Sequence, residues 1–257
     1  MADAHVTAWG EGEPVVLVHG VLTWGTDTAF GFGRQRPLAD AFRLLVMDRR
    51  GYGRSPDVAH SDYRVDADDI VRLLGDGAHL VGHTYGAVAA MLAAARAPEA
   101  VRSLTLIQPG CLQVAADRPV VASALQAARA GLEHMPADLT PETYLRLSLD
   151  AVGMPAVPAT PERLRAAATT MRERPCWQGD LPVEPLAAAP WPKLVIIGDW
   201  AGAPPLYREK AGGPVMVTAR VTAERIGARF LELPGYYPHV QHPDRVNDAL
   251  RALFRAA

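Results

Sequence analysis

The chain has 257 residues, of which 49% are hydrophobic and 21% charged, and its formal net charge is -2. This length accommodates one large domain with an insertion, and the composition is ordinary for a soluble globular protein. The small net charge, with no block of lysine and arginine, gives no electrostatic reason to expect nucleic acid or an anionic membrane as a partner.

The N-terminal residues and the cysteines set further bounds. Residues 1–5 lack the charged-then-apolar pattern of a signal peptide, and no run of 18 apolar residues occurs. Cys111 and Cys176 are too few for a disulfide framework and lack metal-ligand spacing. No phosphate-binding glycine loop is present. We therefore expect a cytoplasmic protein with reduced thiols, without cofactor or metal, whose partner is a small molecule.

Short apolar runs alternate with helical patterns along the first 110 residues. The runs, typical of strands buried on both faces, cover 14–18, 42–47, 78–82 and 101–107. Apolar residues at helical spacing predict a helix over 65–74. Residues 34–41 can form a short helix, and a helix-favouring run of small residues begins at residue 86.

Composition changes between residues 111 and 190, which are rich in alanine, arginine and proline. Helical patterns occur near 118–134, 141–150 and 161–174, and no buried-strand pattern does. We predict a helical cap over 111–190, inserted into an α/β core formed by 1–110 and 191–257.

The final segment returns to the α/β pattern, with strands expected over 193–198 and 229–233 and helices over 217–226 and 245–255. Alternation of this kind predicts a mostly parallel sheet flanked by helices.

The segment 78–90 carries the most informative motif. A strand pattern ends at Gly82, a helical pattern begins at Gly86, and Thr84 lies between them in a G-x-T-x-G string. A G-x-S-x-G nucleophile elbow has the same spacing, with glycines where two backbones come close. A β-branched residue on that strained turn costs on the order of 1–3 kcal/mol. We expect the Thr84 hydroxyl to be exposed above the sheet.

Ligands of parallel sheets bind beyond the carboxyl ends of the strands. That rule brings five segments around one cleft: 19–24, 84–85, 108–111, 199–203 and 236–239.

Four motifs together make this chain resemble the α/β-hydrolase superfamily, in its capped epoxide-hydrolase-like and carbon–carbon-hydrolase-like branch. They are His19-Gly20, the D-R-R-G-Y-G-R-S string of 48–55, the G-x-T-x-G string, and Pro234-Gly235 followed by His242-Pro243. They cover nearly the whole chain outside the cap. The resemblance implies an α/β-hydrolase fold and says less about the activity.

The same resemblance implies a nucleophile, a histidine and an acid, and all three positions depart from it. Thr84 stands at the nucleophile and Tyr236 at the histidine position, while Ala201 stands where the acid is expected. His239 is a nearby substitute base and Asp199 a substitute acid. A structural histidine and a loop-capping aspartate are the alternatives. The other family position for the acid holds Gln108.

The anion-stabilising part of such a site survives these changes. We expect the backbone N–H of Tyr85, with that of Val21 or Leu22, to polarise a carbonyl. Trp24 and Trp200 are candidates for the pocket wall, together with His83 and Gln108. Trp177, Tyr144 and Tyr237 are further aromatic candidates, and Cys111 is expected to be a buried, inert thiol.

Three functions follow from this pattern. The sequence favours an enzyme that binds a carbonyl-bearing small molecule and promotes cyclisation, elimination or rearrangement, with Thr84 and Tyr236 donating hydrogen bonds. The first alternative is an ester or lactone hydrolase that uses Thr84 as nucleophile, His239 as base and Asp199 as acid. The second is a catalytically silent binding protein.

Overall fold

The computed structural model describes residues 3–136, 138–151, 153 and 156–257. Within them, strands form a seven-stranded sheet in the order β1-β3-β2-β4-β5-β6-β7. The strands are β1 (Val6–Trp9), β2 (Glu13–Val18), β3 (Phe42–Met47), β4 (Ala78–His83), β5 (Val101–Ile107), β6 (Lys193–Gly198) and β7 (Arg229–Leu233). Strand β1 is antiparallel to β3, and the other pairs are parallel. The predicted fold class is confirmed.

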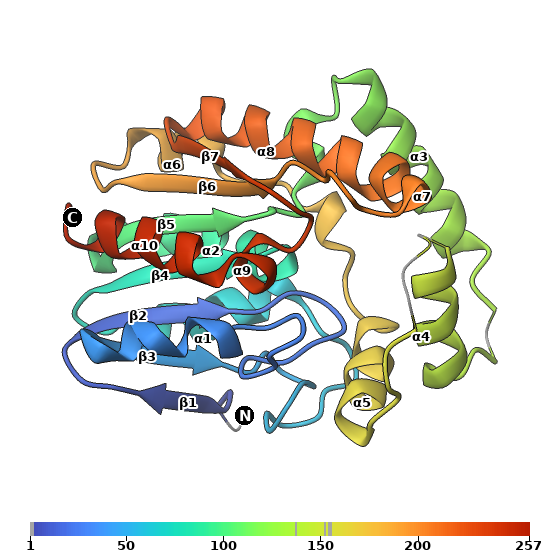
Figure 1. The fold of residues 1–257 in the computed structure, drawn as a ribbon, viewed down its shortest axis with the longest axis horizontal. Coiled ribbons are helices and arrows are strands. Elements are labelled where there is room, and N and C mark those ends of the chain that lie inside the picture. The colour runs from blue at the N-terminus through green and yellow to red at the C-terminus, as the bar shows by residue number, and fades with distance from the viewer. Residues whose placement is uncertain (1–2, 137, 152, 154–155) are drawn as a thin grey trace.

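Helices cover both faces of this sheet (Figure 1). The α-helices are α1 (Tyr63–Leu74), α2 (Tyr85–Arg96), α3 (Pro119–Glu133), α4 (Pro141–Asp150), α5 (Pro161–Thr170), α6 (Val183–Ala188), α7 (Pro205–Tyr207), α8 (Gly213–Ile226), α9 (Pro238–Gln241) and α10 (Pro243–Phe254). Short 3-10 turns are η1 (Gly33–Asp40), η2 (Pro98–Ala100), η3 (Leu112–Ala115) and η4 (Cys176–Gln178), and η5 (Arg208–Gly212) is a π-turn.

Two apolar cores lie on opposite faces of the sheet, because successive strand side chains alternate in direction. Val16 and Val18 of β2 belong to the core that contains α1, α2 and α8. Val15 and Leu17 belong to the core that contains η1 and α10. Burial on both faces explains why the strands appear in the sequence as continuous apolar runs.

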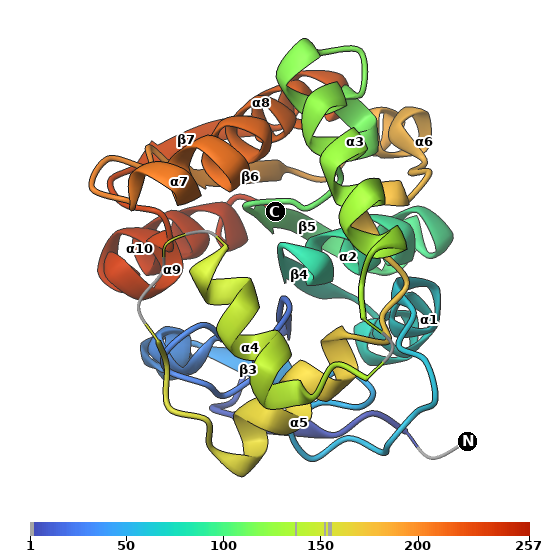
Figure 2. The same ribbon diagram turned by 90° about the vertical axis from the view of Figure 1, so that its right-hand side faces the viewer.

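The segment predicted to be a cap contributes α3 to α6. Helices α4 and α5 pack together beyond the carboxyl ends of the strands and face the viewer in Figure 2. Helices α3 and α6 pack against α8 instead. No strand occurs among the described residues between 111 and 190. The division into core and cap at residues 110 and 191 stays a prediction.

Several boundaries differ from the expectations. The edge strand β1 was not foreseen, because its residues are only partly buried and form no apolar run. Helix α6 was missed too. Helix α5 ends at Thr170, and α8 begins at Gly213, four residues before the expected start, since η5 feeds directly into it.

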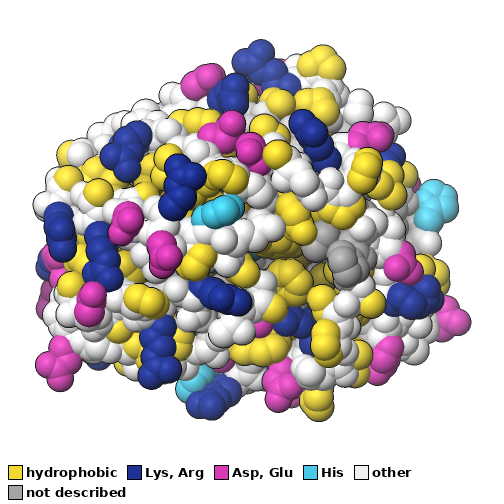
Figure 3. Space-filling view, in the orientation of Figure 1, with side chains coloured by type: hydrophobic (Ala, Val, Ile, Leu, Met, Phe, Trp, Pro, Cys, Tyr) yellow, Lys and Arg dark blue, Asp and Glu magenta, His cyan; other side chains and the backbone are white. Residues whose placement is uncertain are grey.

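Charged side chains of both signs are interspersed on the face shown in Figure 3. Among the described residues, no helix combines the length and the apolar character needed to span a membrane.

Candidate active site

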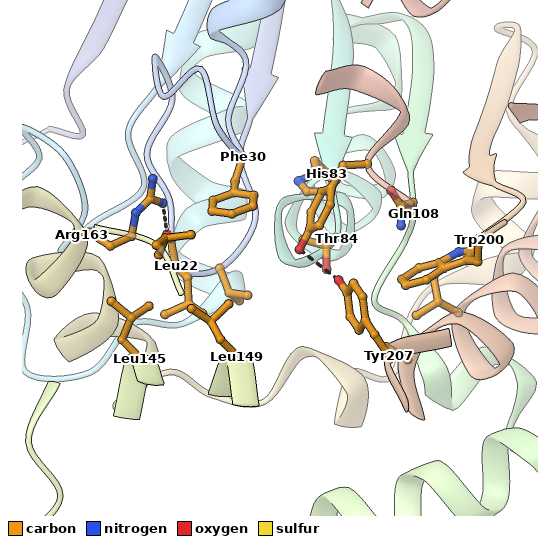
Figure 4. Close-up of a pocket in the computed structure, with 15 residues that line it drawn as sticks. Leu22, Phe30, His83, Thr84, Gln108, Leu145, Leu149, Arg163, Trp200 and Tyr207 are labelled. Carbon is orange, nitrogen blue, oxygen red and sulfur yellow. Dashed lines mark hydrogen bonds between the residues drawn. The ribbon is translucent and has the colours of Figure 1, made fainter. Parts of the chain in front are cut away.

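A cavity of about 200 Å³ lies at the carboxyl ends of β2, β4, β5 and β6, under α4 and α5 (Figure 4). Its lining is mostly apolar: Val21, Leu22, Phe30, His83, Thr84, Gln108, Leu145, Leu149, Val157, Arg163, Trp200, Tyr207, Ala211, Val215 and Tyr237. Seven of the residues expected from the sequence line it: Val21, Leu22, His83, Thr84, Gln108, Trp200 and Tyr237.

Backbone strain is concentrated around this cavity. Four non-glycine residues of the described chain have positive φ: Leu22 at 57°, Thr84 at 44°, Gln108 at 46° and Trp200 at 57°. All four line the cavity, and each follows the carboxyl end of a strand. Such conformations cost on the order of 1–3 kcal/mol each and typically cluster at functional sites.

The nucleophile elbow has the geometry that its glycines predict. A Cβ on Gly82 would lie 2.5 Å from the carbonyl oxygen of Gly86, and one on Gly86 would lie 2.2 Å from that of Val18. Strand β4 and helix α2 can therefore meet only without side chains at these positions.

The Thr84 side chain fits between two further glycines. A Cβ on Gly20 would lie 2.1 Å from the Thr84 methyl carbon, and one on Gly110 would lie 3.4 Å from the Thr84 oxygen. The methyl is thus seated against Gly20, and the hydroxyl is on the Gly110 side. Within the described residues the Thr84 hydroxyl has no hydrogen-bond partner.

Two backbone amides beside Thr84 are available to a ligand. The N–H of Leu22 donates to Thr170 Oγ1 at 3.2 Å and is therefore occupied. The N–H groups of Val21 and Tyr85 have no acceptor in the described part of the chain. Tyr85 is also the first residue of α2, where the helix dipole favours negative charge. This pair can stabilise an oxyanion.

The predicted base, His239, does not contact Thr84. Its Nε2 lies 3.2 Å from the carbonyl oxygen of Phe30, and its ring lies against His83, with centroids 4.2 Å apart. Burial lowers the pKa of His239 to about 4, and burial likewise holds the pKa of His83 well below its usual value. Both imidazoles are therefore neutral near pH 7, and His83 is the one that lines the cavity.

The predicted acid, Asp199, caps a loop. Its Oδ1 accepts from the N–H of Ala201 at 2.8 Å and from that of Gly235 at 2.9 Å. No ion pair or hydrogen bond joins it to His239 in the described residues. The structure therefore does not assemble the expected relay from Thr84 through His239 to Asp199.

Tyr236 is displaced from the cavity by its neighbour. Tyr236 contacts the rings of Trp200 and Tyr207, with centroids 6.3 and 5.8 Å away, and does not line the cavity. Tyr237 does line it, and it accepts a hydrogen bond of 3.0 Å from the hydroxyl of Tyr207 (Figure 4). Burial raises the pKa of both Tyr207 and Tyr237, so both hydroxyls keep their protons at neutral pH.

Two residues expected at the site, Trp24 and Tyr85, do not line the cavity. Trp24 lies outside the lining, with the Arg163 guanidinium 4.8 Å from its ring centroid. Tyr85 places its buried ring 3.9 Å from the guanidinium carbon of Arg49, so only its amide serves the candidate oxyanion site. Cys111 is buried, and burial raises its pKa to about 11, which agrees with an inert thiol.

Sequence reasoning missed Arg163, the charged residue of the cavity wall. From α5 it donates to Leu22 O and, at 2.8 Å, to Asp27 Oδ2, and so it ties the cap segment to the loop after β2. No motif marks an arginine in an arginine-rich helix as special. The sequence analysis also missed four other lining residues, because no motif includes them: Phe30, Leu145, Leu149 and Tyr207.

No group of three histidine, cysteine or acidic side chains in the described part is arranged to hold a metal ion.

A profile of the alpha/beta hydrolase family matches residues 15–249. The chain belongs to this family. Solved structures agree with the fold: an alpha/beta hydrolase from Sphaerobacter thermophilus aligns over 98% of this chain and 96% of its own, with a TM-score of 0.66 and 24% identity. An esterase from Thermogutta terrifontis covers 98% of this chain and 93% of its own, with a TM-score of 0.62 and 24% identity.

Curated relatives match shorter segments. A pimeloyl-[acyl-carrier protein] methyl ester esterase from Methylococcus capsulatus is 39% identical over 38% of this chain and 37% of its own length. The corresponding esterase from Aeromonas hydrophila is 30% identical over 58% of each chain. A cis-3-alkyl-4-alkyloxetan-2-one decarboxylase from Shewanella oneidensis is 31% identical over 45% of this chain and 38% of its own. This chain therefore spans less than two thirds of these relatives.

Proposed function

We propose that this family member cleaves an ester or lactone of an apolar small molecule, held in the cavity with its carbonyl carbon over Thr84. The observation that carries the proposal is the elbow, where Thr84 at φ 44° stands beside the acceptor-free amides of Val21 and Tyr85. Donors fixed in place stabilise the negative charge that develops on a carbonyl oxygen during attack. The esterase relatives favour hydrolysis over the non-hydrolytic reaction that the sequence favoured.

The cavity supports an apolar acyl or ring group as the recognised part. Leu145 and Leu149 of α4 and Val215 of α8 supply apolar walls of the cavity. Arg163 has its charge engaged by Asp27, so the described lining of the cavity offers no free cation that would select an acidic substrate. A neutral ester fits this lining better than a charged one.

One step in this proposal needs a proton acceptor for the Thr84 hydroxyl. His83 is the neutral imidazole in the cavity wall, and the His239 ring packs against it at a tilt of 52°. His239 donates its Nε2–H to the Phe30 carbonyl, so its basic nitrogen is Nδ1, which has no hydrogen-bond partner among the described residues.

A non-hydrolytic reaction of a carbonyl compound is the second candidate. The observation that favours it is the Tyr207–Tyr237 pair, which presents protonated hydroxyls to the cavity and can donate a proton or a hydrogen bond. A decarboxylase is also among the relatives.

Turnover of p-nitrophenyl butyrate and methyl octanoate tests the proposal. We expect acid and alcohol as products, a burst of p-nitrophenol, and loss of turnover in Thr84→Ala with ligand binding retained. Loss of turnover in Tyr237→Phe but not in Thr84→Ala would favour the second candidate. Binding of methyl octanoate without turnover of either ester would contradict the proposed hydrolysis and leave the non-hydrolytic candidate or a silent binding protein.

A further inference from the structure

A buried charged cluster lies directly behind the Gly20–Val21 peptide. Its centre is Arg49, which follows β3 and is fully buried. Its guanidinium donates to Asp66 Oδ2 at 3.1 Å, to Glu173 Oε1 at 2.5 Å and to the carbonyl oxygen of Gly20 at 3.0 Å. The chemistry proposed above uses none of these side chains.

The Gly20 carbonyl accepts a second hydrogen bond from His19. The backbone N–H of Arg49 donates to His19 Nε2 at 2.9 Å, which leaves the ring proton on Nδ1. That Nδ1 lies 2.8 Å from the Gly20 oxygen, so the carbonyl takes one neutral and one cationic donor. Hydrogen bonds from charged donors are roughly twice as strong as neutral ones.

The other end of this same peptide group is the N–H of Val21, one of the two acceptor-free amides beside Thr84. A peptide is a resonance unit, so electron density drawn to its oxygen leaves the nitrogen and makes the N–H a stronger donor. We propose that Arg49 is a positioning residue of this site, which orients and polarises the Gly20–Val21 peptide so that Val21 N–H binds a substrate carbonyl more strongly.

The negative charge of Glu173 opposes this effect. Besides Arg49, its Oε1 accepts from the hydroxyl of Tyr52 at 2.5 Å, and that hydroxyl is 3.0 Å from Thr170 Oγ1, the acceptor for Leu22 N–H. An ionised Glu173 neutralises part of the Arg49 charge, whereas a protonated one leaves that charge directed at Gly20. Glu173 thereby sets the strength of the Val21 donor.

Protonation of Glu173 falls in an accessible range, because burial raises its pKa to about 7 against the opposing effect of Arg49. The other titratable or charged groups near this carboxylate are Asp66 on α1, Tyr85 on α2, Tyr144 on α4, and Tyr52, Arg174 and Cys176 in the adjoining loops.

The polarisation is a property of the free protein, so NMR of the unliganded chain tests it. Hydrogen bonding at a peptide carbonyl moves its ¹³C′ resonance and the ¹⁵N resonance of the same peptide downfield. We expect Arg49→Met to move Gly20 ¹³C′ and Val21 ¹⁵N upfield, and Glu173→Gln to move both downfield at pH 8. In the wild type these shifts titrate near pH 7, and in Glu173→Gln they do not.

Opposite signs separate polarisation from mere support of the loop, since loosening the cluster would move both variants in one direction. Shifts of the same sign, or unchanged shifts in a folded Arg49→Met, would overturn the proposal. If Arg49→Met does not fold, the direction of the shifts in Glu173→Gln and the pH titration of the same shifts in the wild type decide alone.

Catalysis gives the second readout, and this part depends on the proposed function. Arg49→Lys keeps the positive charge but lacks the several fixed N–H donors of a guanidinium. With p-nitrophenyl butyrate as substrate, we expect roughly a tenfold loss in kcat with little change in KM. An unchanged kcat would refute the catalytic part. Absence of turnover in the wild type would refute the proposed function but leave the NMR result standing.

Discussion

At the scale of single residues, the site differs from a hydrolase elbow with serine because Thr84 has an additional methyl group. Its hydroxyl keeps the position of a nucleophile, while its methyl carbon occupies the space next to Gly20. A β-branched side chain has fewer χ1 rotamers, so the hydroxyl is fixed more tightly than that of a serine would be. The methyl also narrows the approach to the reacting carbon.

Replacing Thr84 by serine tests whether this methyl limits the reaction. We expect Thr84→Ser to hydrolyse p-nitrophenyl butyrate about tenfold faster, because the attacking oxygen gains rotamers and room. This change corresponds to an activation free energy lower by about 1.4 kcal/mol. Steady-state kinetics checks this. Thr105→Ser, a buried threonine on β5 outside the cavity lining, is the matched control and should leave kcat/KM unchanged. A slower Thr84→Ser would show that the methyl helps the reaction.

The sequence predicted the positions of Thr84, Gln108 and Trp200 in the cavity wall because each follows a strand that was itself evident. It gave the catalytic role to Tyr236 and named Tyr237 only as a further aromatic candidate. The two residues are adjacent, and only the local backbone decides that the Tyr237 ring lines the cavity. Arg49 and Glu173 are 124 positions apart in the chain, and no sequence pattern links them.

At the scale of elements, the strands were predictable, and the helices of the predicted cap segment were less so. Strands β2 to β6 are buried on both faces, which leaves a continuous apolar signal. The edge strand β1 and the short helix α6 lack such a signal and were missed. The helices α4 and α5 were located by proline at their first positions, and their caps agree.

The cap of α5 gives a test at this scale. Thr160 Oγ1 accepts from the N–H of Arg163 at 3.2 Å. We expect Thr160→Ala to lower the free energy of unfolding by about 1 kcal/mol, the usual contribution of such a cap, and to weaken ligand binding because α5 carries Arg163. Urea unfolding measures the first effect.

Ser123→Ala, at an exposed position inside α3, is the control for this prediction, and it should leave stability unchanged or slightly raised. An equal loss of stability in both variants would mean that the cap of α5 contributes nothing of its own.

At the scale of the whole molecule, the fold places its strained residues and a cluster of buried charges around the cavity. The strained residues Leu22, Thr84, Gln108 and Trp200 surround the cavity, and the buried Arg49 cluster lies behind it. Strained backbone and buried charges typically cluster at functional sites, because selection for stability alone does not favour them. The strained and charged groups around this cavity therefore lower the free energy of unfolding of the molecule.

The pH dependence of stability measures part of that cost. Burial raises the pKa of Glu173 from 4.5 to about 7, so the folded state binds more protons than the unfolded state between these values. The contribution of this group is therefore fully present below about pH 4.5 and is lost as the pH rises through about 7. His79 and His239, whose pKa values burial lowers to about 4, act in the opposite direction.

A comparison between variants isolates the Glu173 effect. Glu173→Gln cannot titrate at this position, so we expect its unfolding free energy relative to the wild type to rise steadily from pH 5 to pH 8. Urea titrations at several pH values provide the measurement, and Glu142→Gln, at an exposed position of α4, is the control. A constant difference across this range would show that Glu173 has an ordinary pKa.

The central claim is that the amides of Val21 and Tyr85 hold a substrate carbonyl over Thr84. Isotope-edited infrared spectroscopy of methyl octanoate, labelled with ¹³C at the carbonyl and bound to Thr84→Ala, tests this most directly because no turnover competes. We predict that the carbonyl band shifts to lower wavenumber on binding, as two hydrogen bonds require. A bound ester whose carbonyl band stays at its position in an apolar solvent would contradict the account.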